Sequence, residues 1–236
     1  IIKPQICIAE NVRGLVSHDN GKTLKTIIDV MENDIGYDVI SPEICQAIFY
    51  EVPQKRERLF LIGIKKRSGL IFNYPDKVSE PYTVKDALKK GRLFKTNVPK
   101  AEFQKYTKRK QQIMSKVPGG GNWRDLPEKL QKEYMGGSYH LGGGKTGIAR
   151  RLSWDEPSLT LTTAPAMKQT ERAHPEENRP LTYREYARIQ TFPDDWNFMG
   201  SLNSKYKQIG NAVPVNLAKY IGYEIINTLN KTNQKT

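Results

Sequence analysis

The stretch VPQKRERLFLIGIKK, Val52–Lys66, joins a charged half to an almost wholly apolar half. The apolar half predicts a β-strand that enters the core of the protein. The charged half carries Gln54, Arg56 and Arg58 at every second position. Side chains two residues apart on a strand point the same way, so we expect these three side chains to meet at one site. A second interpretation is that arginines at a strand end are only solvated.

A strand, a helix and another strand precede this stretch. The run QICIAENV, residues 5–12, predicts a buried strand that ends in Glu10 and Asn11. Apolar residues then recur at helical spacing over residues 24–35, and YDVI, residues 37–40, predicts the next strand. This order is typical of an α/β fold, in which ligands bind at the carboxyl ends of the strands.

The rest of the chain divides into a loop-rich part and a helical end. After the apolar strand the sequence becomes basic and rich in proline and glycine. Helices return with the capping box TYRE, Thr182–Glu185, and with Pro214 in the first turn of a last helix. We therefore predict an α/β part over residues 1–66, a second domain over 67–204, and a closing helix within 205–236 that packs back on the first part.

The net charge of +13 is concentrated in one region. Residues 65–133 hold 18 Lys and Arg against 7 Asp and Glu, whereas the remaining residues hold 20 against 18. Such a segment is typical of a module that binds the phosphates of a nucleic acid. A basic but merely soluble surface is the alternative. No long apolar run or amphipathic basic helix accompanies the charge, so we do not expect membrane binding.

The cysteines and histidines indicate neither disulfides nor a metal site. Two cysteines, Cys7 and Cys45, cannot form a disulfide framework, and the 3 histidines lack metal-ligand spacing. We expect a cytoplasmic protein without a metal. Clustered carboxylates with a lysine, as in a metal-dependent nuclease, are not found either.

Two glycine motifs invite a phosphate-binding interpretation. GGGKTG, residues 142–147, is not a P-loop, because Tyr139 stands where that motif needs its first glycine and no strand precedes it. Gly210 and Asn211 are expected just before the last helix, where free backbone N–H groups favour an anion or a polar cofactor group. Taken alone, the Gly-Asn pair favours the interpretation as an ordinary turn.

Four stretches together resemble the later conserved blocks of the bacterial DNA (cytosine-5) methyltransferases of restriction-modification systems. In order they are AENVRGL (9–15), VPQKRERLFLIGI (52–64), RPLTYREYARIQTFPDDW (179–196) and KQIGNAVPVNLAKYIG (207–222). The resemblance implies part of a Rossmann-like S-adenosylmethionine-methyltransferase sheet in residues 1–66. It also implies a smaller, loop-rich α+β target-recognition domain that binds double-stranded DNA, and use in the bacterial cytoplasm at the nucleoid.

The resemblance also implies roles in catalysis. In the family, a cysteine thiolate attacks C6 of a cytosine flipped out of the duplex, and C5 then takes the methyl group of S-adenosylmethionine. Glu10, with Asn11 beside it, matches the acid that stabilises charge at N3 of the ring. Arg58 matches the residue at the cytosine O2, and Arg56 matches the partner that positions the acid and its loop.

Further matches concern the cofactor and the DNA. Asn211, Ala212 and Val213 correspond to a turn beside S-adenosylmethionine. Arg184 and Arg188 are expected to be structural ion-pair or phosphate partners, and Gln54 to have a supporting role that binds phosphate or backbone. The candidate DNA contacts are Gln54, Arg124, Lys145, Arg150, Arg151, Thr160 and Leu161.

Two family elements have no counterpart in this sequence. Nothing reads as the Phe-x-Gly-x-Gly loop that holds most of S-adenosylmethionine, and neither Cys7 nor Cys45 lies in a Pro-Cys-Gln element upstream of Glu10. We therefore expect an incomplete chain, inactive alone, that needs a missing N-terminal half or a partner subunit and that self-associates through a cut sheet edge. A tRNA cytosine-5 methyltransferase and a non-catalytic DNA-recognition subunit are the alternatives.

Overall fold

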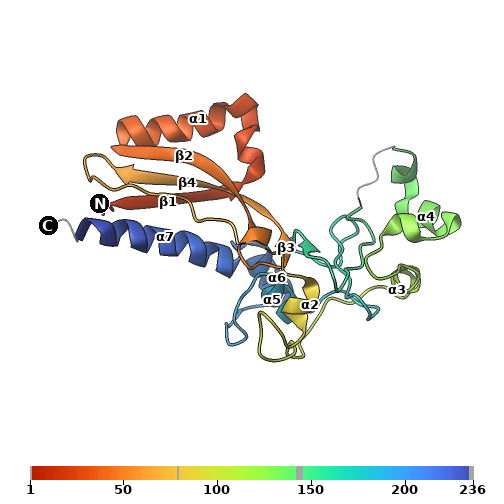
Figure 1. Ribbon diagram of the computed structural model, residues 1–236. Helices are drawn as coiled ribbons and strands as arrows, with labels where there is room; N and C mark the ends of the chain where they lie inside the picture. Colours follow the sequence, from red (N-terminus) through yellow and green to blue (C-terminus); the bar gives the residue numbers. More distant parts are fainter. Residues whose placement is uncertain (1, 79, 142–145, 234–236) are drawn as a thin grey trace.

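A three-stranded sheet forms the centre of the first part of the molecule (Figure 1). The computed structural model describes residues 2–78, 80–141 and 146–233. The sheet order is β1 (Ile6–Val12), β4 (Glu57–Lys65) and β2 (Tyr37–Gln46), and both outer strands run antiparallel to β4. β1 and β2, which the predicted helix connects, are therefore parallel to each other but separated by the strand that follows them in sequence. The α/β class is confirmed.

Helices cover both faces of this sheet (Figure 1). α1 (Lys22–Asp29) continues into a π-helical turn (Val30–Asp34) on one face, where Met31 is buried against Gly63. α7 (Val215–Asn233) covers the other face, where Leu217 and Ile221 pack with Phe60. The predicted helix over residues 24–35 and the last helix after Pro214 are both confirmed.

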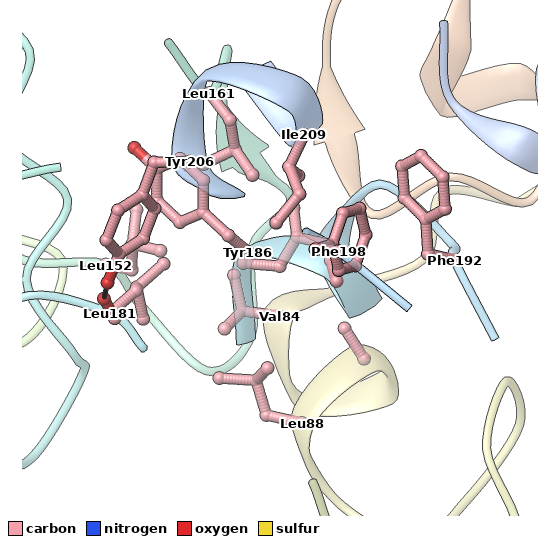
Figure 2. Packing of buried hydrophobic residues seen from close by; sticks show 13 residues of the cluster. Val84, Leu88, Leu152, Leu161, Leu181, Tyr186, Phe192, Phe198, Tyr206 and Ile209 are labelled. Atoms are coloured by element: carbon pink, nitrogen blue, oxygen red, sulfur yellow. Dashed lines mark hydrogen bonds between the residues drawn. The ribbon is translucent and has the colours of Figure 1, made fainter. Parts of the chain in front are cut away.

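A second core forms around α2 (Val84–Leu88), α5 (Tyr183–Ile189) and α6 (Leu202–Asn211) (Figure 2). Its centre holds Tyr186 and Tyr206, whose rings meet edge to face with centroids 5.1 Å apart. The predicted capping box at the start of α5 is confirmed, because the Thr182 and Glu185 side chains each accept the backbone N–H of the other. Neither α2 nor α6 was expected.

The remaining elements are short. A third core joins α3 (Lys108–Met114) and α4 (Glu128–Met135), which Figure 1 shows at the end of the molecule far from the sheet. A two-stranded parallel sheet pairs β3 (Gln54–Lys55) with β5 (Ser158–Leu159). The 3-10 helices are Arg13–Val16, His18–Gly21, Ala47–Phe49, Trp123–Asp125 and Gly136–His140.

The packing partner of the chain changes between α6 and α7. Tyr206 and Ile209 of α6 belong to the second core, which is formed around α2, α5 and α6 and is called the α2–α5 core below. In contrast, α7 packs on the sheet. The domain division at residues 66 and 204 remains a prediction, because packing alone does not define independent domains. At the end of α6, a Cβ atom on Gly210 would lie 2.3 Å from the backbone oxygen of Thr162. No side chain larger than hydrogen fits there without movement of backbone.

We expect Gly210→Ala to destabilise the protein by about 1–3 kcal/mol, the usual cost of forcing extra atoms into a packed site. Gly222→Ala is the matched control, since Gly222 lies within α7 and an added Cβ would have open space around it. That control should be neutral or stabilising by up to about 1 kcal/mol. Urea unfolding of both variants measures the difference, and equal effects would contradict the close approach at Gly210.

Candidate active site

Glu10 and Arg58 form an ion pair across neighbouring strands. Residues 8, 10 and 12 of β1 share a face of the sheet with residues 58, 60 and 62 of β4, because Glu10 pairs with Phe60 and Val12 with Arg58. The Arg58 Nε lies 2.6 Å from the Glu10 Oε1, and the side chains are 11% and 28% exposed. Burial lowers the pKa of Arg58, an effect that the Glu10 carboxylate partly offsets. The ion pair is thus largely buried but still accessible to a ligand.

A cavity of about 450 Å³ opens beside Arg58. Its volume falls within the range of roughly 300–1,000 Å³ that is usual for small-molecule sites. The wall includes Val12 from the end of β1, Gly14 from the 3-10 helix that follows, Arg58 from β4, and Thr160 from the segment after β5. The cavity therefore joins the sheet to a segment that lies about a hundred residues further along the chain.

Three polar side chains hold the rim of this cavity. Glu57 accepts hydrogen bonds from Arg13, at 3.0 Å, and from Gln46, at 3.1 Å. These bonds join the segment after β1 to the end of β2, across β4. Sequence reasoning missed this cluster, although Glu57 lies between the two arginines of the opening motif. The sequence held one indication of the cluster: Glu57 stands between the two arginines, so alternation places its side chain on the opposite face of the strand.

Arg56 lines the cavity together with Arg58, but its guanidinium is bound at a buried junction of the chain. The chain leaves one sheet for the other at this residue, because β3 ends at Lys55 and β4 begins at Glu57. The guanidinium of Arg56 is buried and donates to the backbone carbonyls listed here: Leu161 at 2.9 Å, Gly210 at 2.8 Å and Ala212 at 3.0 Å. Burial lowers the pKa of Arg56 to about 10, which leaves it charged at neutral pH. The expected meeting of side chains at one site agrees with the places of Arg56 and Arg58, which both line the cavity.

Gln54 is also buried at the same junction. Its Oε1 accepts the backbone N–H of Leu161 at 2.8 Å, and its Nε2 donates to Gln190 at 3.0 Å. The backbone-binding alternative agrees with these contacts. A contact with DNA phosphate is wrong, because the side chain has no exposed surface.

Two further candidate DNA contacts are buried as well. Leu161 packs in the α2–α5 core. Arg151 donates to backbone carbonyls from four places in the chain, which are Met114, Val117, His174 and Glu177. Both predictions are corrected. The core encloses the side chain of Leu161, and four backbone carbonyls and the Asn178 side chain take the donors of the Arg151 guanidinium.

The other candidate DNA contacts remain predictions. Thr160 lines the cavity. Arg150 is mostly buried, with its guanidinium 3.7 Å from Glu156. Arg124 is exposed. Lys145 lies outside the described residues.

The segment Asn211–Val213 joins α6 to α7, with only Pro214 between Val213 and the first residue of α7. Asn211 is the last residue of α6, so the nearest helix end exposes carbonyl groups rather than free N–H groups. The expected anion site at a helix N-terminus is corrected on this point. Asn211 is exposed, the carbonyl of Ala212 is bound by Arg56, and Val213 packs beside the sheet core. Their predicted place beside S-adenosylmethionine remains a prediction.

The two cysteines lie in different surroundings. Cys7 is on the opposite face of β1 from Glu10, and burial raises the pKa of its thiol. Cys45 pairs with Arg58 in the sheet, so it is the thiol nearest to the candidate site in register. It is nevertheless buried in the core beneath α7, and burial raises its pKa to about 11. A thiol of this kind is a poor nucleophile.

We expect Cys45 to resist alkylation in the folded protein. With a pKa of about 11, roughly one thiol in a thousand is ionised at pH 8. Mass spectrometry after a timed exposure to iodoacetamide measures the modification of Cys45, and the same exposure in urea gives the reaction of the unfolded thiol. Equal rates in the two conditions would contradict the buried, protonated state.

Neither a metal nor a membrane is indicated by the described residues. Within the ranges that the structure covers, no three His, Cys, Asp or Glu side chains are placed to bind a metal ion. In the same ranges, every helix is too short or too polar to cross a bilayer.

Comparison with known families identifies the class of protein. The chain matches the family of C-5 cytosine-specific DNA methylases over residues 1–227. It therefore belongs to this family.

Two bacterial Type II methyltransferases are among the curated relatives. The chain is 58% identical to the Type II methyltransferase M.Eco47II of Escherichia coli over 236 residues, which cover 99% of this chain and 56% of that protein. It is 52% identical to M.Sau96I of Staphylococcus aureus over 232 residues, which cover 98% of this chain and 53% of that protein. The chain thus spans about half the length of these relatives.

Solved structures support the fold. A DNA modification methyltransferase encoded within an Escherichia coli prophage superposes with a TM-score of 0.62 at 23% identity, over 97% of this chain and 70% of that chain. The Dnmt2 methyltransferase of S. pombe superposes with a TM-score of 0.53 at 15% identity, over 96% of this chain and 68% of that chain.

Proposed function

We propose that this chain supplies the acid and the arginine of a DNA cytosine-5 methyltransferase active site. The reaction transfers a methyl group from S-adenosylmethionine to C5 of a cytosine flipped out of duplex DNA. The observation that carries the proposal is the Glu10–Arg58 ion pair, 2.6 Å long, beside a cavity that can receive a base. The names of the Type II methyltransferase relatives support the same activity within a restriction-modification system.

The two side chains have complementary tasks. Thiolate addition at C6 pushes negative charge toward N3 and O2 of the ring. Glu10 shares or donates a proton at N3, and Arg58 places its positive charge at O2. Both groups are fixed by adjacent strands, so little reorganisation is needed when charge develops. S-adenosylmethionine supplies the electrophilic methyl group when bound, and Asn211 contributes to the wall of its site.

We propose that the nucleophilic cysteine comes from outside this sequence. Cys7 points to the other face of the sheet, and Cys45 is buried and protonated. β1 is an edge strand of the described sheet, and its side chains Ile8 and Val12 are largely exposed. We infer that this edge pairs with a strand of the polypeptide that carries the cysteine and the rest of the cofactor site, and that the chain alone is inactive.

DNA contact is proposed for the basic part of the molecule. Residues 65–133 carry an excess of 11 positive charges, from 18 Lys and Arg less 7 Asp and Glu. We propose that residues 67–204 form the recognition domain. Within it, Arg124, Lys145 and Arg150 remain candidates for phosphate or base contacts, and Thr160 lies where that domain meets the cavity.

A methyl-transfer assay tests this function. The chain is assayed alone and together with the product of the coding sequence that adjoins it upstream, with tritiated S-adenosylmethionine and either duplex DNA or tRNA. We expect 5-methylcytosine in duplex DNA from the combined sample only. Labelled tRNA with unlabelled DNA would favour the tRNA methyltransferase. DNA binding without any label would favour a non-catalytic recognition subunit.

A further inference from the structure

Thr160 and Leu161 are held from two sides. From the side of the sheet, the Leu161 N–H and carbonyl are bound by Gln54 and Arg56, at 2.8 Å and 2.9 Å. The Thr160 hydroxyl donates to the carbonyl of Lys55 at 2.6 Å. From the other side, Arg172 Nη2 donates to the carbonyl of Thr160 at 2.8 Å. Through these hydrogen bonds, Thr160 and Leu161 connect Arg172 to the strand that leads to Arg58.

Arg172 lies in the segment that follows Thr160, a residue of the cavity wall. Its backbone N–H donates to the carbonyl of Pro165, and its carbonyl accepts from Leu181. Its side chain is buried, with 6% of the residue exposed, and its other hydrogen bond goes to the carbonyl of Glu171 at 2.5 Å. A group so enclosed cannot bind DNA directly. Burying a guanidinium is costly, so its bonds to carbonyls are needed to offset the lost hydration.

Arg172 and Arg56 bind neighbouring carbonyls from different parts of the molecule. Arg172 fixes Thr160, whose side chain forms part of the cavity wall. Arg56 fixes Leu161 and also the end of α6. A shift of residues 165–172 would therefore move Thr160 relative to Arg58. The same residues are bonded to the basic part of the chain, because Lys110 donates to the carbonyl of Ala166 and pairs with Glu171.

We propose that Arg172 is a positioning residue that couples DNA contact in residues 67–204 to the geometry of the cavity beside Arg58. This inference rests on the proposed function, because it assigns Arg172 to the turnover of the same site. A displacement of about 1 Å at a reacting centre can cost about a hundredfold in rate. The coupling therefore predicts a loss in kcat with little change in DNA affinity.

The test uses the active enzyme that contains this chain together with its upstream partner. Arg172→Met removes the donors, and Arg172→Lys keeps the charge and one donor toward Thr160. Arg188→Met is the matched control, because Arg188 is an equally buried arginine that binds the carbonyls of Thr96 and Asn97 and pairs with Asp194, away from the cavity wall. For each variant, kcat for methyl transfer, Kd for duplex DNA and Tm are measured, with rates taken below the Tm.

We expect Arg172→Met to lower kcat by about 10- to 100-fold with Kd changed less than about 3-fold. Arg172→Lys should recover part of the rate, and it carries the test if Arg172→Met does not fold. Arg188→Met should lower Tm but not produce this separation of kcat from Kd. Equal kcat losses for the Arg172 and Arg188 variants, or a loss of affinity in proportion to rate, would overturn the inference alone. Absence of methyl transfer to DNA by the unaltered enzyme would overturn the proposed function and the role of Arg172 with it.

Discussion

Replacing Glu10 with Gln should lower methyl transfer by about 10²–10⁴-fold in the active enzyme, the usual contribution of a positioned acid or base. The amide keeps the shape of the side chain but cannot deliver a proton to N3. It also leaves Arg58, which is only 11% exposed, without its carboxylate partner at 2.6 Å. DNA affinity should change by less than about 3-fold, because the phosphate contacts that dominate such affinity lie elsewhere.

Glu43→Gln is the matched control for this experiment. Glu43 of β2 pairs with Phe60 of β4, just as Glu10 of β1 does, so the two carboxylates lie on the same face at the same level of the sheet. Glu43 is not a member of the ion pair with Arg58. Its variant should retain kcat to within about 3-fold, far less than a catalytic acid would cost. Unchanged turnover in Glu10→Gln, or equal losses in both variants, would exclude the role assigned to Glu10.

The elements with strong periodicity could be predicted from the sequence. The apolar half of β4, the helix over residues 24–35 and the apolar stripe of α7 each bury one consistent face, and their patterns record it. α6 was missed because Tyr206 and Ile209 are its only buried apolar side chains, and two such residues make no periodic pattern. The position of β4 between β1 and β2 was also beyond local pattern, since strand order depends on pairing between distant segments.

The opening motif shows where the pattern of a strand stops being informative. Alternation predicts a shared direction only while the chain stays in one sheet. At Arg56 the chain passes from the pair β3–β5 to the sheet β1–β4–β2, so backbone carbonyls at the junction bind the Arg56 guanidinium, whereas Arg58 pairs with Glu10. The family resemblance placed Glu10 and Arg58 in one site, and the two side chains are in contact in the structure. The resemblance carried no information on which arginines are buried.

Buried arginines were the least predictable part of the site. Arg56, Arg151, Arg172 and Arg188 are enclosed because backbone carbonyls from distant segments bind their guanidinium groups. Composition predicts exposed arginines, and carbonyl acceptors are present at every residue, so the sequence holds no mark of these contacts.

Replacing Arg56 with Met should produce the largest loss of stability, about 3–5 kcal/mol, because three backbone carbonyls lose a charged hydrogen-bond donor. The change leaves the carbonyls of Leu161, Gly210 and Ala212 without this donor, at a cost of about 1–3 kcal/mol for each buried group that stays unsatisfied. Arg56→Lys should lose less, since an ammonium keeps the charge but lacks the planar fork that reaches separate carbonyls. Urea unfolding followed by tryptophan fluorescence measures the free energy of unfolding.

Arg13→Met provides the comparison that separates burial from charge. Arg13 is also an arginine in contact with this cavity, but its side chain is 66% exposed and it pairs with a single carboxylate, that of Glu57. An exposed pair of this kind contributes about 0–1 kcal/mol. If Arg56→Met costs no more than Arg13→Met, the junction of β3, α6 and the Leu161 segment must be held by other contacts. A much larger cost for Arg56→Met would mean that one guanidinium joins the sheet to the α2–α5 core, so that the cavity beside Arg58 forms only when both parts are folded together.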